Sequence, residues 1–207
     1  MTEMSANGVV LPHYHGLTQF QVFAAGSGKM GRNEIQPLMV QFKDPFTAYG
    51  PVEAGPQGLS FFAMRIKTAR SGPVYLNKPG AREAMKPSKR RNLVSAPVKL
   101  STEPVLQFRK EASWESILPW EQYDDGFAAQ VVRLGAGMSV MGPDPQRSDG
   151  YYLLVGNGSL VHQGRDYPLW SMVVVEPGEP GFEIKAGPKG LEALVLEFPK
   201  NNDEHAQ

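Results

Sequence analysis

Residues 13–28 read HYHGLTQFQVFAAGSG, and this stretch decides how the chain folds. It begins with two histidines, His13 and His15, which are separated by one residue. In an extended strand both imidazoles point to the same face, so they can converge on one point. It ends with Gly-Ser-Gly at 26–28, which predicts a hairpin turn because glycine accepts the positive φ that such turns need.

Between these ends the residues alternate with the period of a β-strand. A turn at residues 16–18 leads into Gln19, and from there Gln19, Gln21 and Phe23 share one face of the strand. The two glutamines on one face predict a polar cavity in this part of the chain.

A degenerate copy of this stretch occurs later in the chain. Residues 20–28 (FQVFAAGSG) match residues 150–158 (GYYLLVGNG) 130 positions later, and residues 54–59 (AGPQGL) match residues 186–191 (AGPKGL) 132 positions later. Self-similarity at a nearly fixed offset indicates repeated architecture. The offset increases from 130 to 132 between the two matches, so the second copy has two extra residues. We predict that they lie within residues 159–170.

The second copy lacks the histidines. At the first offset His13 and His15 fall on Pro143 and Pro145, and the inward row becomes largely apolar. The second unit is therefore expected to be filled and structural, with this inward row: Asp149, Tyr151, Leu153 and Val155.

At these positions the chain resembles the cupin superfamily. The first cupin motif has Gly, five residues, His-x-His, three or four residues, Glu, six residues and Gly. His13, His15 and Gly26 fall on this spacing, Gln19 stands where the family has its glutamate, and Tyr49 lies near the fourth ligand histidine of the second motif. The resemblance covers roughly residues 9–66 and 127–198.

This resemblance implies an all-β fold with two cupin-like antiparallel β-barrels of the jelly-roll type in tandem. The 22 glycines and 18 prolines suit many short strands joined by turns. The predicted domains are an N-terminal barrel at 1–70 with incomplete first strands, a linker at 71–110, a C-terminal barrel at 111–200 and a tail at 201–207.

One strand of the first barrel has no visible counterpart. The apolar strand at residues 127–134 would correspond to residues before position 5, where no comparable run exists. An open sheet edge is normally covered. We expect residues 104–109 of the linker, or the second subunit of a homodimer, to cover it.

Two functions remain open. The first is a small-molecule-binding protein of unknown substrate, with Gln19, Gln21 and Tyr49 as ligand-binding residues. The alternative is a metal-dependent cupin enzyme, similar to dioxygenases, isomerases or decarboxylases, that uses His13 and His15 to bind Fe, Mn, Ni or Zn. Paired histidines are common metal ligands, but a pocket for a small organic molecule without any metal fits the sequence equally.

Composition excludes other classes. The formal net charge is zero, so no electrostatic attraction to nucleic acid or membrane is expected, and there are no cysteines for disulfides or thiolate metal sites. The first residues lack the basic and apolar regions of a signal peptide. We therefore expect a cytoplasmic protein.

Overall fold

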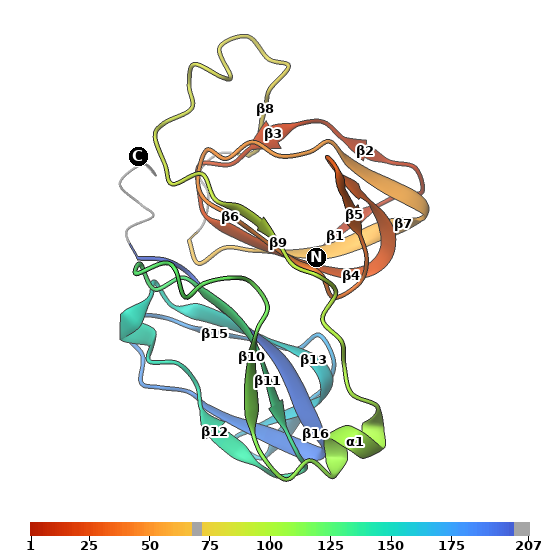
Figure 1. Ribbon diagram of the computed structural model, residues 1–207, viewed down its shortest axis with the longest axis vertical. Helices are drawn as coiled ribbons and strands as arrows, with labels where there is room; N and C mark the ends of the chain where they lie inside the picture. Colours follow the sequence, from red (N-terminus) through yellow and green to blue (C-terminus); the bar gives the residue numbers. More distant parts are fainter. Residues whose placement is uncertain (68–71, 201–207) are drawn as a thin grey trace. The chain divides into compact units, whose positions relative to one another are not determined.

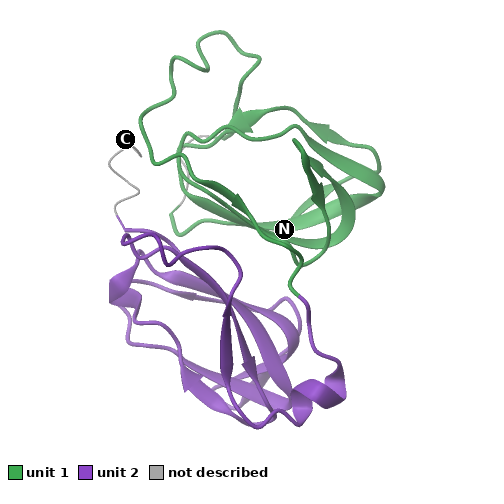
Figure 2. Cartoon of the chain, viewed as in Figure 1, with its two compact units in different colours: residues 1–98, 202–207 green, residues 99–201 purple. Residues whose placement is uncertain are grey.

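The structure is a computed structural model that describes residues 1–67 and 72–200, and it consists almost entirely of β-strands (Figure 1). It divides into two compact units, unit 1 with Met1–Val98 and unit 2 beginning at Lys99 (Figure 2). The predicted linker at 71–110 is therefore shared between the units. The predicted tail, residues 201–207, lies outside the described residues.

Unit 1 contains a seven-stranded antiparallel sheet and a separate two-stranded sheet. The order of the large sheet is β1 (Thr2–Met4), β7 (Val52–Met64), β4 (Gln19–Met30), β6 (Val40–Lys43) and β9 (Asn92–Val94), with β2 (Val9–Val10) paired to β7 and β5 (Asn33–Ile35) paired to β4. The small sheet pairs β3 (His13–Tyr14) with β8 (Val74–Tyr75).

Unit 2 repeats this arrangement. Its seven-stranded sheet has the order β10 (Ser113–Ser116), β11 (Ala128–Leu134), β16 (Glu183–Glu197), β13 (Tyr151–His162) and β14 (Arg165–Tyr167), with β12 (Ser139–Met141) paired to β16 and β15 (Met172–Val175) paired to β13. A five-residue helix, α1 (Glu103–Gln107), and a 3-10 turn, η1 (Pro145–Arg147), complete the unit.

The all-β fold class is confirmed, but in the described residues neither large sheet closes into the predicted barrel. Each sheet is an open path of strands. In unit 1 the strands at the two ends of that path, β1 and β9, have three residues each and do not pair with one another.

The two units match in register, although not where the sequence predicted. In β4 a bulge lies between Phe23 and Ala25, and in β13 an equivalent bulge lies between Val155 and Asn157, an offset of 132. The extra two residues of the second copy therefore fall between β12 and β13, because the four strands β4 to β7 all share this offset with β13 to β16. The predicted position at 159–170 is wrong.

The strand that seemed to be missing from unit 1 exists in a short form. Met4 of β1 pairs with Leu59, and Leu134 of β11 pairs with the equivalent Leu191. The linker segment at 104–109 does not add a strand, since it forms α1 and buries Leu106 against Gly190 of unit 2. Proline in the first turn favours this helix.

Gly26 bends a strand and does not form the predicted hairpin turn. It lies inside β4 at a second bulge with a φ of +79°, and a Cβ there would stand 2.1 Å from the carbonyl oxygen of Gly58 on β7. Gly158 and Gly190 repeat this close approach in unit 2. A glycine with positive φ fits a bulge as well as a turn, and the hairpin turn itself lies at residues 31–32, between the paired Met30 and Asn33.

A buried ion pair links residue 91, in the segment between β8 and β9, to the residue that follows β6. Arg91 donates from Nε to Oδ2 of Asp44 at 2.9 Å and from Nη2 to Oδ1 at 2.8 Å, and both side chains are almost fully buried. The basic segment at 86–91 is thus tied to the end of β6. In the described part of the chain we find no helix long and apolar enough to cross a membrane.

Candidate functional site

The site is built on the face shared by β4 and β6. Gln19 lies directly opposite Lys43, and Gln21 lies directly opposite Gln41. Directly opposed residues of an antiparallel pair have side chains on the same face. All four side chains are buried, with exposures of 3% or less, so the sheet presents a polar patch toward the interior of unit 1.

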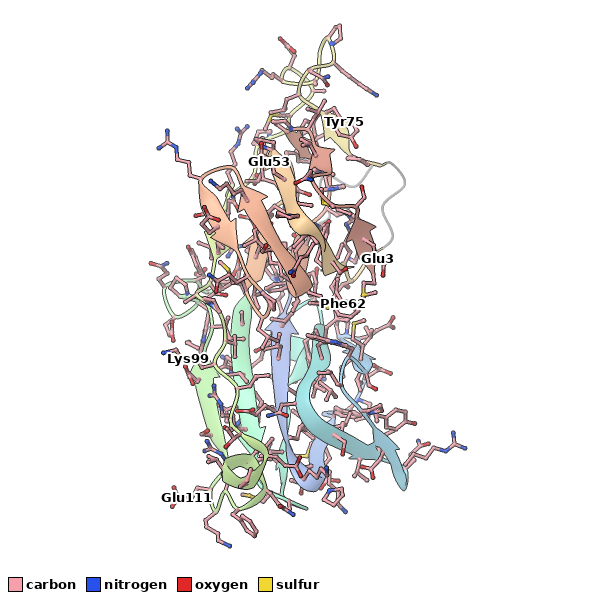
Figure 3. All side chains as sticks on the ribbon, turned by 90° about the vertical axis from the view of Figure 1, so that its right-hand side faces the viewer. Glu3, Glu53, Phe62, Tyr75, Lys99 and Glu111 are labelled. Carbon is pink, nitrogen blue, oxygen red and sulfur yellow. The ribbon has the colours of Figure 1, made fainter. Side chains whose placement is uncertain are left out.

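The two histidines lie beside this patch. The backbone of His13 exchanges two hydrogen bonds with Tyr49, at 3.1 and 3.0 Å, and the two rings are 4.3 Å apart between centroids. The His15 ring is 5.2 Å from that of His13. Tyr75, labelled on β8 in Figure 3, packs on the other side of His13 at 5.5 Å. The short β3–β8 sheet thus holds the first imidazole in place.

The hydrogen bonds define the proton position on the His13 imidazole and show that His15 acts as an acceptor. Nδ1 of His13 donates to the carbonyl oxygen of Leu11 at 2.8 Å, which leaves Nε2 without a proton in the neutral ring. Nη2 of Arg65, just beyond β7, lies 3.4 Å from each ring nitrogen of His15. Because a guanidinium only donates, His15 accepts through an unprotonated nitrogen. The same Nη2 also donates to Oε1 of Gln19.

Several buried polar atoms at this site have no partner in the described structure. Nζ of Lys43 lies 2.8 Å from the centroid of the Tyr49 ring and has no hydrogen-bond acceptor. Nε2 of Gln19 and the side-chain oxygens of Gln21 and Gln41 are also unpartnered. Buried polar groups are normally hydrogen-bonded, so these atoms indicate that something else occupies the site, either water or a ligand.

We call these eight residues the polar cluster: His13, His15, Gln19, Gln21, Gln41, Lys43, Tyr49 and Arg65. Its electrostatics follow from burial and from two basic side chains. Burial, followed by Arg65 and Lys43, lowers the pKa of His15 to about 3, and burial also lowers the pKa of His13. Burial and then Arg65 hold the pKa of Lys43 well below its usual value. Burial raises the pKa of Tyr49 to about 12, although the Gln19 and Gln21 side chains act in the opposite direction. At neutral pH both imidazoles are neutral and the phenol keeps its proton.

The cluster does not fit a divalent metal centre. Its only imidazoles are those of His13 and His15, and no carboxylate belongs to it. Among the described residues no group of three or more His, Cys, Asp or Glu side chains could hold a metal ion. The guanidinium of Arg65, whose Nη2 lies 3.4 Å from both ring nitrogens of His15, would repel a metal cation at this position.

The structure brings together all five residues that the sequence singled out: His13, His15, Gln19, Gln21 and Tyr49. Sequence reasoning missed Gln41, Lys43 and Arg65. The alternation in residues 40–43 (VQFK) places Gln41 and Lys43 on one face of a strand. Only the pairing with β4 shows that this face is the buried polar one.

Unit 2 has apolar residues at the equivalent positions. Tyr151 and Leu153 stand where unit 1 has Gln19 and Gln21, and both belong to a closely packed apolar core. The sequence predicted that the interior of unit 2 is filled. This prediction is wrong in one place, because a cavity of about 510 Å³ is lined by residues of unit 2 alone.

Comparisons with known proteins support the fold. No protein-family model matches the chain, and no curated protein is similar in sequence. Among solved structures, a deletion mutant of Bacillus subtilis oxalate decarboxylase has 10% identity and a TM-score of 0.57, covering 95% of this chain and 67% of that one. A salicylate 1,2-dioxygenase from Pseudaminobacter salicylatoxidans has 12% identity, a TM-score of 0.57 and coverages of 95% and 69%.

A third similar structure is itself named as a cupin protein. The cupin 2 conserved barrel domain protein from Leptotrichia buccalis has 9% identity and a TM-score of 0.52, covering 95% of this chain and 80% of that one. Another oxalate decarboxylase structure is described as having Mn(II) centers. At such low identity these similarities establish a shared fold and leave the activity open. The chain therefore has the fold of cupin proteins.

Proposed function

We propose that unit 1 binds a small organic anion, with its carboxylate held by Lys43 and Arg65. The observation that carries this proposal is Lys43, which is only 2% exposed and whose Nζ has no hydrogen-bond partner among the described residues. A buried charge without a partner is costly. A bound carboxylate would supply the missing partner.

The other members of the cluster suit the same ligand. Arg65 provides a planar donor fork that matches a carboxylate, and the unpartnered Nε2 of Gln19 can donate to it. The unpartnered oxygen of Gln21 needs a donor, which a hydroxyl next to the carboxylate would provide. A hydroxy acid would satisfy more of the cluster than a simple carboxylic acid.

The low pKa of Lys43 couples this binding to protons. A carboxylate beside the amine favours its charged form and raises its pKa, so the anion is bound together with a proton. Affinity is therefore expected to decrease as the pH rises from neutral toward 9. No reaction step is assigned to the cluster.

Both units are further proposed to be copies of one cupin-like β-unit, of which only the first kept a polar interior. The shared offset of 132 from β4 to β7 and the paired glycine bulges support a duplication. The apolar residues of β13 support the loss of that polar interior in the second copy.

The proposal is tested by calorimetric titration of the purified protein with acetate, propionate and lactate. We expect lactate to bind more tightly than propionate, which lacks the hydroxyl. Lys43→Met, which keeps the volume and removes the amine, should abolish binding. Lys29→Met is the matched control, because Lys29 is exposed on β4 and pairs only with Glu34 at the surface. Equal binding by Lys43→Met and the wild type, or no binding of any of the three acids, would overturn the proposal.

A further inference from the structure

The cavity in unit 2 is lined by both aromatic and charged side chains. Its volume of about 510 Å³ is in the range of small-molecule sites. Four aromatic side chains line it: Trp114 of β10, and Trp120, Tyr123 and Phe127 of the segment that leads from β10 to β11. Glu197, at the end of β16, also lines it.

Glu197 is the buried charge of this cavity. Its side chain is 8% exposed, and in the described residues its carboxyl makes no hydrogen bond and no ion pair within 4 Å. Burial raises its pKa to about 7, although the charge of Arg147 acts in the opposite direction. Glu197 is thus a partly compensated buried acid, whereas Lys43 in unit 1 is a buried base beside a second basic group.

The register places Glu197 where unit 1 has Arg65. Glu197 lies opposite Tyr151 on β13, the counterpart of Gln19, whose oxygen accepts a hydrogen bond from Arg65. The equivalent end of the duplicated sheet is thus basic in unit 1 and acidic in unit 2. The two sites would therefore select ligands of opposite charge.

The remaining charged groups of the cavity are exposed, and Glu197 is the buried one. Arg147, Lys200 and Asp124 line the cavity but are exposed to solvent, where their charges are screened. Trp120 presents an indole Nε1 that is buried and has no acceptor. The cavity therefore offers aromatic faces and one buried carboxyl group.

We propose that this cavity is a second binding site, which takes a small organic cation. The aromatic rings attract the cation through their faces, and Glu197 neutralises its charge. This site is independent of the anion site proposed for unit 1, because every residue that lines it belongs to unit 2.

The test uses choline, which is permanently charged and has a hydroxyl, and its neutral carbon analogue 3,3-dimethylbutan-1-ol. Binding is followed by tryptophan fluorescence, since all three tryptophans of the chain, at positions 114, 120 and 170, lie in unit 2. Choline should change the emission and bind at least tenfold more tightly than the alcohol. Its affinity should rise between pH 6 and pH 8 as Glu197 ionises.

Glu197→Gln should reduce the affinity for choline at least tenfold and remove its dependence on pH. The fold should survive this change, because the carboxyl has no hydrogen bond to lose, and circular dichroism checks this. Glu183→Gln is the matched control, since Glu183 lies on the same strand but is exposed and outside the cavity. Equal affinity for choline and the alcohol, or unchanged choline binding by folded Glu197→Gln, would overturn the proposal.

Discussion

Replacement of the buried lysine by methionine gives the sharpest test of the polar cluster without any ligand. Lys43 lies on β6 with an exposure of 2%, and burial holds its pKa well below 10.5 in the folded state. In the unfolded chain the amine has its ordinary pKa. Between these two pKa values the unfolded state therefore binds one proton more than the folded state does.

The sign and size of the effect follow from linkage. When the unfolded state binds more protons, the free energy of unfolding increases with pH, by about 1.4 kcal/mol per pH unit for one proton. Wild type should therefore gain about that amount between pH 8.5 and pH 9.5 relative to Lys43→Met. This interval lies below the range in which Tyr49, with its pKa raised to about 12, affects stability.

The variant should also be more stable than the wild type at pH 7.5, by about 1–3 kcal/mol, because it removes an unsatisfied buried polar atom. The assay is urea unfolding followed by far-ultraviolet circular dichroism at three pH values. Lys29→Met, at an exposed position, should keep the wild-type slope. If Lys43→Met and the wild type show the same pH slope, the amine is not buried as described and the anion site loses its basis.

Three further predictions concern stability. Asp44→Asn removes the charge that pairs with Arg91, and it should destabilise unit 1 by about 3–5 kcal/mol in urea unfolding because a buried guanidinium is left uncompensated; a loss below 1 kcal/mol would show that the pair is hydrated. Gly26→Ala should cost at least about 1–3 kcal/mol, since its Cβ would overlap the carbonyl oxygen of Gly58, whereas Gly178→Ala, which meets nothing within 4 Å, should be neutral by the same assay; equal effects would exclude the close approach of the two strands. Incubation with EDTA should leave the melting temperature unchanged, because the paired histidines sit beside two basic groups; a decrease of several degrees would support a bound metal instead.

The sequence alone predicted much of the fold. Alternation in the stretch that begins at Gln19 indicated strands, and the internal repeat indicated two related β-units. The spacing of His13, His15 and Gly26 pointed to the cupin fold, which the solved structures support. The all-β class and the cupin fold could be inferred because strand periodicity and motif spacing are read directly along the chain, whereas in the described residues neither large sheet closes into the expected barrel.

Other features could not be read from local pattern. Gly26 has the same positive φ that a hairpin would require, and only the position of β7 turns it into a bulge. Residues 104–109 look like a strand by composition, yet they form a helix that packs on β16. In both cases the contact that decides the conformation comes from a distant segment.

The sequence alone determined which residues lie on the same face of a strand. It did not determine which strands pair with one another. The alternation placed Gln19 with Gln21, and it placed Gln41 with Lys43, but the charge of the site depends on the pairing of β4 with β6 and on the reach of Arg65 from the end of β7. Strand pairing joins residues that are far apart in the chain, and burial then changes their pKa values. For that reason the proposal of an anion site could be made only from the tertiary structure.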